Sequence, residues 1–357
     1  MSTVALGPRH PVLAFDLGGS WWRVGLLTDA CAVRLLCRVP AVNHRNTAKP
    51  VPGLQADLVD FVVERTREQR RRHGFDAVGV SLGAALNGHT GEVLGSAPLW
   101  GGGTAPFNLA AALREALPDV RWTVLNDVSA LAVELLAHSL PGRRATAVTV
   151  SSGIACRTID LRTGHIPLDP VHGVQGEIGH LPARFTALGR EVRAHCECGA
   201  PDHLAAFSSG RGIEALLREL PEARPLRDRS PDDVVGAFTA AVRGGDPRAR
   251  SLLDDFTRPL AEVLLHQAVL DPGVERTVLS GGVVDGLGDH YRDSLLRNLA
   301  ALGLYGIDDP AYFARRITRA SDDGLAALRG AGIRARSPLD LIDVHLTKGE
   351  RREVLDR

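Results

Sequence analysis

Lysine is almost absent from this chain: Lys49 and Lys348 are the only two among 357 residues, and arginine supplies nearly all of the positive charge. The 42 basic and 42 acidic residues give a formal net charge of zero, which argues against a general nucleic-acid or anionic-membrane partner. No uninterrupted apolar run reaches the roughly 20 residues of a membrane-spanning helix. No basic stretch with an apolar core marks a signal peptide. We therefore expect a cytoplasmic protein with neither a nucleic-acid nor a membrane partner.

Cysteine is also scarce, and its number is odd. Five cysteines in a chain of this length fit a reducing cytoplasm with metal ligands better than a disulfide framework. Cys31, Cys37 and Cys156 have no partner at a metal-ligand spacing, so we expect them to be small core residues.

The other two cysteines belong to a group of four zinc-type ligands. These fall within 24 residues: His180, Cys196, Cys198 and His203. Two thiolates and two imidazoles complete a tetrahedron with no open position, which predicts a structural zinc. His195 could replace His203 as the fourth ligand, and the alternative to a metal site is two surface histidines near an ordinary thiol pair. The metal would brace a loop that begins with Glu177 and His180, two groups suited to a polyhydroxylated substrate.

Common phosphate-binding motifs are missing. No Gly-Lys-Ser/Thr occurs, and no strand is followed by G-x-G-x-x-G, so a bound phosphate would be held by backbone N–H groups and hydroxyls. Three predicted strands nevertheless end in a small or acidic loop, at Asp16, Ser151 and Ser280. We expect these three loops to face a common cleft.

The apolar pattern predicts an α/β protein. A hairpin over 12–27 carries Asp16 and two glycines at its tip, and further strands are predicted over 77–82, 121–125, 147–150 and 277–279. Helices are predicted over 54–72, 109–117, 128–138, 208–220, 231–243 and 248–270, with a last helix starting at 323. Residues 165–201 read mostly as loop and 337–357 as a polar tail. The length favours two domains: residues 1–126, with 318–357 packing on them, and 127–317.

Five short segments occur in one order: Asp16-Leu17-Gly18-Gly19-Ser20, Asn126-Asp127, Gly176-Glu177-Ile178-Gly179-His180, Cys196-x-Cys198-Gly199 and Ser280-Gly281-Gly282. From about Pro11 to about Ile333 the chain thereby resembles the ROK family of sugar kinases and related repressors. The resemblance implies an actin-like, ribonuclease H-like fold with two α/β domains around a central cleft for ATP and a sugar. It also implies a homodimer. Family repressors carry an N-terminal helix-turn-helix, and the first strand begins too early to leave room for one, which favours a kinase.

The resemblance assigns roles by motif position. Asp127 would be the general base that takes the proton of the attacking hydroxyl, although an Asp there could also be the N-cap of the next helix. Asp16 would hold Mg²⁺ through water. The predicted substrate ligands are Gly83, Asn126, Glu177 and His180. The predicted ATP ligands are Gly18, Gly19, Ser20, Ser151, Ser152 and Gly153 at the phosphates, and Gly281 and Gly282 at the adenosine. The first glycines could equally form a plain hairpin turn.

Departures from the family pattern bear on the substrate. His203 replaces a cysteine, Ala205 replaces a glutamate that holds sugar hydroxyls, and Leu99 replaces the Asn of a Pro-Asn pair. The second phosphate loop, 151–156, has lost most of its glycines. A buried hydroxyl left without a partner costs roughly 1–3 kcal/mol, so an unmodified hexose would fit poorly. This points to the C7-cyclitol kinases of acarbose- and validamycin-type pathways. An ordinary hexose or N-acylhexosamine kinase and a non-catalytic sugar sensor are the alternatives, and retention of Asp127 speaks against a sensor.

Overall fold

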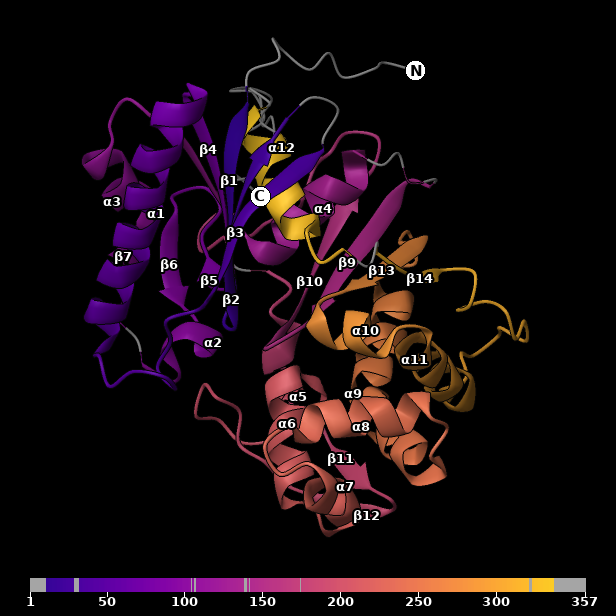
Figure 1. Ribbon diagram of the computed structural model, residues 1–357. Helices are drawn as coiled ribbons and strands as arrows, with labels where there is room; N and C mark the ends of the chain where they lie inside the picture. The colour runs from indigo at the N-terminus through magenta and orange to yellow at the C-terminus, as the bar shows by residue number, and fades with distance from the viewer. Residues whose placement is uncertain are drawn as a thin grey trace.

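The computed structural model describes residues 11–336, apart from 29–31, 104, 106, 138–139, 141, 174 and 321–322. Its helices and strands form two α/β halves, the N-terminal one at the upper left and the C-terminal one at the right and lower right in Figure 1. The predicted tail 337–357 and Cys31 lie outside the described residues. None of the helices in the described ranges is both long and apolar enough to cross a membrane.

The N-terminal half is built on a five-stranded sheet in the order β3-β2-β1-β4-β8. Its strands are β1 (Val12–Leu17), β2 (Trp21–Leu27), β3 (Val33–Pro40), β4 (Ala77–Leu82) and β8 (Arg121–Asn126). β1 pairs antiparallel with β2 and parallel with β4, and β4 pairs parallel with β8. Every residue of β1 and β4 is buried, because helices cover both faces of the sheet, as near-continuous apolar strands require.

One face of this sheet packs against α1 (Val51–His73) and α3 (Leu109–Ala116). The other face packs against α12 (Ala326–Arg336), which lies beside α4 (Asp127–Ala137) and is drawn in yellow in Figure 1. Close backbone approach fixes this contact: a Cβ on Gly330 would lie 1.7 Å from the carbonyl oxygen of Ala130. The last described helix therefore packs on the first sheet, while the domain boundaries at 126/127 and 317/318 stay a prediction.

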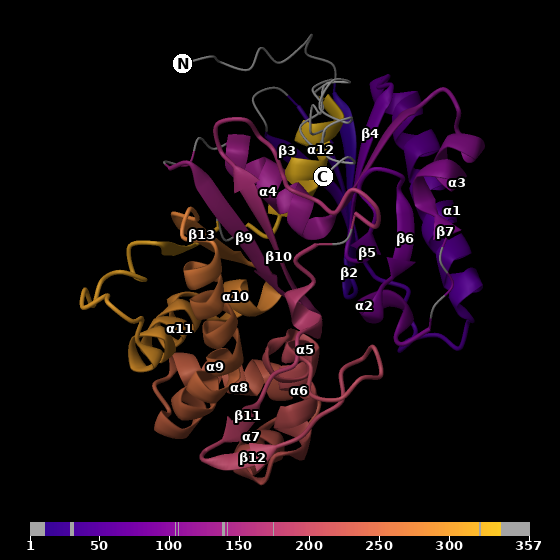
Figure 2. The ribbon, with the colours of Figure 1, turned by 180° about the vertical axis from the view of Figure 1, so that it is seen from behind.

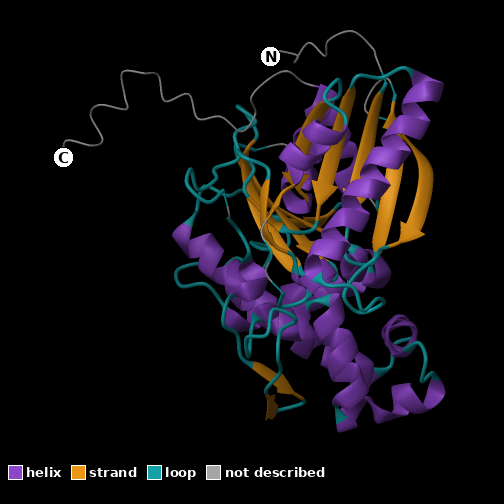
Figure 3. Cartoon of the chain, turned by 90° about the vertical axis from the view of Figure 1, so that its left-hand side faces the viewer, coloured by secondary structure: helices purple, strands orange, loops and turns teal. Residues whose placement is uncertain are grey.

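The C-terminal half contains a four-stranded sheet in the order β10-β9-β13-β14. Its strands are β9 (Arg144–Val150), β10 (Ile154–Asp160), β13 (Arg276–Ser280) and β14 (Ile317–Arg319). The helices of this half are α5 (Leu204–Ser208), α6 (Gly210–Glu219), α7 (Arg224–Arg229), α8 (Val234–Arg243), α9 (Pro247–Leu270), α10 (Gly282–Leu287) and α11 (Asp289–Leu302). The two sheets and the helices around them are visible side-on in Figure 3.

Two smaller sheets complete the fold. One joins β5 (Ala85–Leu86), β6 (Glu92–Gly95) and β7 (Phe107–Asn108), next to the short α2 (Ala97–Trp100). The other pairs β11 (Phe185–Ala187) with β12 (Arg190–Val192). The segment after β10 reaches the N-terminal half (Figure 2). There Asn87 Nδ2 donates to the carbonyl oxygen of Val171 at 3.2 Å.

Most predicted elements are present with shifted ends, and the second phosphate loop is shorter than predicted. The sequence predicts a phosphate loop over 151–156, but residues 154–156 begin β10, which pairs antiparallel with β9. Only Ser151-Ser152-Gly153 forms the turn between these strands, so the loss of glycines at 154–156 reflects a strand rather than an altered loop. The elements that were not predicted are β3, β10, β14, α2, α5, α7, α10, α11 and the two small sheets.

Candidate active site

Two adjoining cavities lie between the halves. The larger, of about 980 Å³, is lined by the three expected loops, including Asp16, Gly18, Gly19, Ser20, Ser151, Ser152, Ser280, Gly281 and Gly282. The smaller, of about 560 Å³, is lined by Gly83, Asn126, Asp127, Gly153, Glu177, His180, Cys196, Cys198 and Ala205, among others. Asp127 lines both. The structure thus brings the predicted site residues together around one cleft, with the carboxylate of Asp127 where the cavities join.

Asp127 is the first residue of α4 and follows β8 directly. Burial raises its pKa to about 7, and the negative charges of Asp16 and Glu177 act in the same direction. The N–H of Val128, which donates to Asp127 Oδ1 at 2.9 Å, and the positive charge of Arg157 oppose this rise. A carboxylate with a pKa near neutral pH is suited to accept a proton during a reaction.

Asn126, rather than Asp127, caps α4. Its Oδ1 accepts from the backbone N–H of Val128 at 3.0 Å and of Ser129 at 3.3 Å. Its Nδ2 donates to the carbonyl oxygen of Ala84 at 2.8 Å. Asn126 therefore satisfies the start of the helix and ties it to the segment after β4. Its contact with a substrate hydroxyl stays a prediction, and one N–H of its Nδ2 is left for that contact.

Gly83 lies directly against the predicted base. A Cβ at this position would lie 3.7 Å from Asp127 Oδ2 and 3.7 Å from the Cα of Gly18. A glycine here keeps the space in front of the carboxylate open.

Asp16 is buried, and both of its carboxylate oxygens have donors. Arg23 Nη1 donates to Oδ2 at 2.7 Å, and Ser81 Oγ donates to Oδ1 at 3.2 Å. Burial raises the pKa of Asp16, whereas Arg23 and Ser81 lower it. These donors leave lone pairs on both oxygens for a cation, and because Mg²⁺ keeps most of its water the contact is expected to run through its hydration shell.

The loops of the two halves touch across the larger cavity. Ser20 Oγ lies 3.2 Å from Ser152 Oγ, so the turn of the first hairpin meets the turn between β9 and β10. Gly281 has a φ of +103°, and a Cβ there would lie 2.6 Å from the carbonyl oxygen of Val150. Gly281 is thereby explained by its positive φ and its close approach to β9 at the start of α10, whereas a Cβ on Gly282 would meet no atom within 4 Å.

Glycines also explain the segment that carries Glu177. Gly176 has a φ of +70°, and a Cβ there would lie 1.9 Å from the carbonyl oxygen of Cys156. A Cβ on Gly179 would lie 2.5 Å from the carbonyl oxygen of Ile154. Residues 176–180 therefore lie flat on β10, which fixes Glu177 and His180 at the smaller cavity.

Arg157 was missed by the sequence reasoning. Its side chain is 1% exposed. The guanidinium donates to Ser129 Oγ at 3.2 Å, to the carbonyl oxygen of Cys156 at 2.9 Å and to Glu177 Oε1 at 3.4 Å. It thus joins β10, α4 and the Glu177 segment behind Asp127. A buried arginine in a strand that was itself not predicted gave no signal in the sequence.

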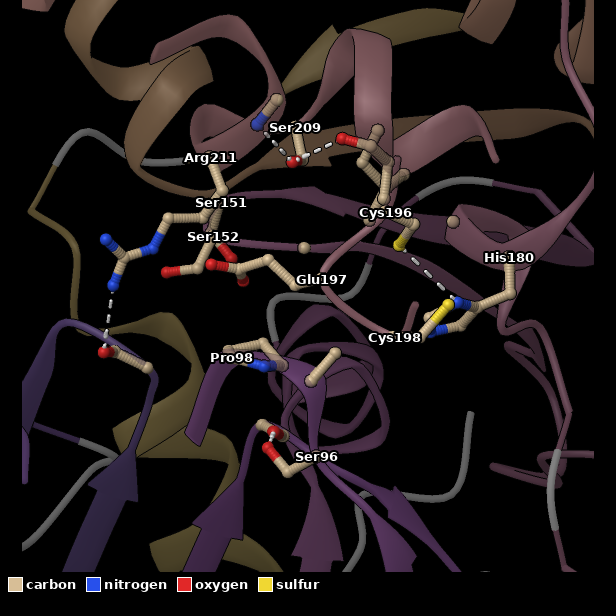
Figure 4. A pocket seen from close by; sticks show the side chains of 18 of the residues that line it. Ser96, Pro98, Ser151, Ser152, His180, Cys196, Glu197, Cys198, Ser209 and Arg211 are labelled. Atoms are coloured by element: carbon tan, nitrogen blue, oxygen red, sulfur yellow. Dashed lines mark hydrogen bonds between the residues drawn. The ribbon is translucent and has the colours of Figure 1, made fainter. Parts of the chain in front are cut away.

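The four predicted zinc ligands form a cluster in which one ligand atom of each residue lies within 4.8 Å of the others. Cys198 Sγ lies 3.3 Å from His203 Nδ1, and His180 Nδ1 lies 3.4 Å from His203 Nδ1 and 4.0 Å from Cys196 Sγ. Figure 4 shows His180, Cys196 and Cys198 converging at one side of the cavity. His195 does not belong to the cluster. Burial lowers the pKa of His180, and the neutral imidazole is the form that binds zinc.

The donor set therefore fits a closed tetrahedral zinc site. The loop between β12 and α5, which carries Cys196, Cys198 and His203, extends toward α2 of the other half (Figure 2). Arg45 Nη1 lies 3.5 Å from Glu197 Oε1 at this contact.

The two substitutions that bear on the acceptor differ in their surroundings. Ala205 lines the smaller cavity. Leu99 does not, because its side chain is 1% exposed in the core of the N-terminal half. The neighbouring Ser96, Ala97 and Pro98 line the cavity instead. The prediction that Leu99 meets the acceptor is therefore wrong, and of the two substitutions only Ala205 changes the lining of the cavity.

The chain has two α/β halves, and glycine-rich loops from both halves line the cleft between them. This arrangement defines an actin-like fold of the sugar kinase type. A family model described as the ROK family matches residues 12–336. The 2-epi-5-epi-valiolone 7-kinase of an Actinoplanes species is 39% identical over 342 residues, covering 92% of this chain and 93% of that protein. The C(7)-cyclitol 7-kinase of Streptomyces hygroscopicus subsp. jinggangensis is 34% identical over 346 residues, covering 90% and 93%.

Among solved structures, a ROK family glucokinase from Streptomyces griseus in complex with glucose and AMPPNP matches with a TM-score of 0.71 at 19% identity. The match covers 91% of this chain and 99% of that one. The chain belongs to the ROK family, as its five ordered motifs predicted, and it has the actin-like fold of that family's kinases.

Proposed function

We propose that this chain transfers the γ-phosphoryl group of ATP to the primary hydroxyl of a C7-cyclitol. The observation that carries the proposal is the position of Asp127 where the two cavities join, with a pKa of about 7. The names of the two relatives that are 39% and 34% identical support the acceptor class. An ordinary hexose or N-acylhexosamine kinase is less favoured, and so is a sensor, because a sensor has no need of a poised base.

In this proposal ATP occupies the larger cavity and the acceptor the smaller one. Gly18, Gly19, Ser20 and the Ser151-Ser152-Gly153 turn hold the phosphates, and Gly281 and Gly282 line the adenosine. Asp127 takes the proton of the acceptor hydroxyl while that oxygen forms a bond to the γ-phosphorus and the bond to the leaving ADP oxygen breaks. Mg²⁺, held through water by Asp16, would neutralise charge on the phosphates.

The acceptor is held by Gly83, Asn126, Glu177 and His180. Arg157 orients Glu177 through the contact of its guanidinium with Glu177 Oε1. The zinc bound by His180, Cys196, Cys198 and His203 would stabilise the loop and take no part in the reaction. Assembly as a homodimer stays a prediction from the family resemblance.

The acceptor preference gives one prediction. Ala205 offers no hydrogen bond, and a buried hydroxyl without a partner is costly. We expect kcat/KM for a C7-cyclitol to exceed that for glucose by at least about tenfold. Ala205→Glu should lower this ratio of cyclitol to glucose kcat/KM. Steady-state ADP release with both acceptors measures it.

Ala205→Met serves as the control, since it fills similar space without an acceptor for a hydroxyl. If Ala205→Glu and Ala205→Met change the ratio equally, Ala205 does not act through hydrogen bonding. A parent enzyme that prefers glucose would support the ordinary hexose kinase instead.

The raised pKa of Asp127 gives a second prediction. The base acts in its ionised form, so activity is lost as the carboxylate becomes protonated on the acid side of a pKa of about 7. The kcat/KM for the acceptor, measured at saturating ATP and Mg²⁺, should rise about tenfold per pH unit up to about pH 7 and then level off. The residual activity of Asp127→Asn should lack this acid limb. A parent profile that is flat from about pH 5.5 to 8 would contradict the assignment.

A further inference from the structure

The proposed reaction places a highly charged phosphoryl group where the two cavities join, and the chain has no phosphate-loop lysine to meet it. Two arginines line both cavities, Arg211 and Arg218. They lie on the same helix, α6, but differ in their partners. Arg218 donates to Glu214 Oε1 at 3.1 Å and to the carbonyl oxygen of Pro231 at 3.1 Å. Its charge is therefore already balanced by a neighbouring carboxylate.

Arg211 forms no such direct ion pair among the described residues. Its Nη2 donates to the carbonyl oxygen of Gly19 at 3.5 Å, a long bond across the cleft to the first phosphate loop. Its Nε is buried and has no hydrogen-bond partner in the part of the chain that the structure describes. Within those same residues Arg211 forms no ion pair with a carboxylate. A half-buried guanidinium without an anion is an unfavourable arrangement unless a ligand supplies the anion.

The position of Arg211 in its helix strengthens this argument. It is the second residue of α6, whose N-cap is Ser209, so the cation stands at the positive end of the helix dipole. Burial and then the like charge of Arg45 lower its pKa, while Glu197 and Glu214 oppose them. A guanidinium stays protonated at neutral pH in spite of such effects. Local structure therefore disfavours a cation here. A bound phosphate would interact favourably with both the guanidinium and the N-terminus of the helix.

The Arg211 side chain also points toward the predicted phosphate site. The amide of Gly210 donates to the carbonyl oxygen of Ser151 at 2.7 Å, which joins the start of α6 to the second phosphate loop. From there Arg211 extends past Ser151 and Ser152 toward the loop of the opposite half (Figure 4). Its guanidinium thus lies between the two loops that would hold the phosphates.

We propose that Arg211 is a further catalytic residue, whose guanidinium binds the nonbridging oxygens of the phosphoryl group during its transfer. This inference rests on the proposed function for the acceptor, but its contact is with the nucleotide. In the absence of ATP the weak bond to Gly19 holds the side chain in place. With ATP bound, charge-assisted hydrogen bonds to the γ-phosphoryl replace it.

The test compares Arg211→Gln with the parent in two experiments. In the first, calorimetric titration with Mg²⁺ and ATP or ADP, without acceptor, should show ATP binding weakened by at least about tenfold and ADP binding by less than about threefold. In the second, kcat with a C7-cyclitol should fall at least about 100-fold, with the acceptor KM within about threefold of the parent. Arg211→Lys keeps the charge but loses the paired N–H donors of the guanidinium. Its ATP affinity and kcat should lie between those of the parent and those of Arg211→Gln.

Arg224→Gln is the matched control, because Arg224 is exposed on α7, pairs with Asp228 at 3.7 Å and lies outside the lining of both cavities. It should leave both measurements unchanged. The proposal is overturned if Arg211→Gln keeps kcat within about threefold of the parent. It is also overturned if ATP and ADP binding weaken equally and thermal stability falls, since Arg211 would then only hold the halves together. A parent that binds ATP with this discrimination but phosphorylates no cyclitol would remove the proposed acceptor and leave the role of Arg211 standing.

Discussion

Replacing Asp127 by asparagine is expected to lower turnover by about 100-fold or more while the binding of ATP and acceptor stays nearly intact. Asparagine has almost the same shape, and its Oδ1 can still accept from the N–H of Val128, which the aspartate accepts at 2.9 Å. It cannot take a proton from the attacking hydroxyl. The loss should therefore fall on kcat and leave the acceptor KM largely unchanged.

The measurement is steady-state ADP release with titration of each ligand by calorimetry. Asp60→Asn, on the exposed side of α1, is the matched control and should behave as the parent does. Turnover of Asp127→Asn within a factor of about three of the parent would contradict the assignment of the base.

Removal of the metal is the second change with a large expected effect. We predict about one zinc per chain after washing with a chelator, held by the cluster whose ligand atoms lie within 4.8 Å of one another. Cys198→Ser should lose the zinc and acceptor binding while ATP binding persists. The reason is that the metal would join the loop between β12 and α5 to His180, which lines the smaller cavity, whereas the residues expected at the adenosine, Gly281 and Gly282, belong to another segment.

Elemental analysis and calorimetry check this prediction. Cys37→Ser is the control, since Cys37 is half-buried in β3 and outside the cluster. Absence of zinc from the washed parent would remove the metal site altogether. Simultaneous loss of ATP and acceptor binding in Cys198→Ser would mean that the metal supports the whole fold rather than one loop.

The N-terminal sheet was predictable because its central strands are buried on both faces. β1 and β4 are short apolar runs that end at polar or glycine-rich turns, and the structure pairs them in parallel. The hairpin around Gly18 and Gly19 was also predicted, since its turn residues are typical of such a connection. β10 was missed because its start was assigned to a loop and because Arg157 interrupts its apolar pattern.

The site was predictable where a motif fixes the backbone. Gly176, Gly179 and Gly281 stand where a side chain would collide with a neighbouring strand, so their positions in the sequence already located the site. Side-chain direction was not predictable in the same way. Leu99 lies beside the cavity-lining Pro98, but its side chain points into the core.

Long-range contacts were the other limit. Arg211 reaches Gly19 across 192 positions of the chain, and no local pattern links the two. Asn126 and Asp127 are adjacent but have different roles. Asn126 caps α4, and Asp127 places its carboxylate where the cavities join; the sequence did not show which residue has which role.

A direct competition tests the central claim, that this ROK protein is a C7-cyclitol kinase. The enzyme is given a C7-cyclitol and glucose at equal concentrations with a limiting amount of ATP and Mg²⁺, and the phosphorylated products are resolved by ³¹P NMR. Because the product ratio equals the ratio of kcat/KM values, the account predicts at least about ten cyclitol phosphates, substituted at the primary hydroxyl, for each glucose phosphate. Predominance of glucose phosphate, or consumption of ATP with neither acceptor phosphorylated, would contradict it.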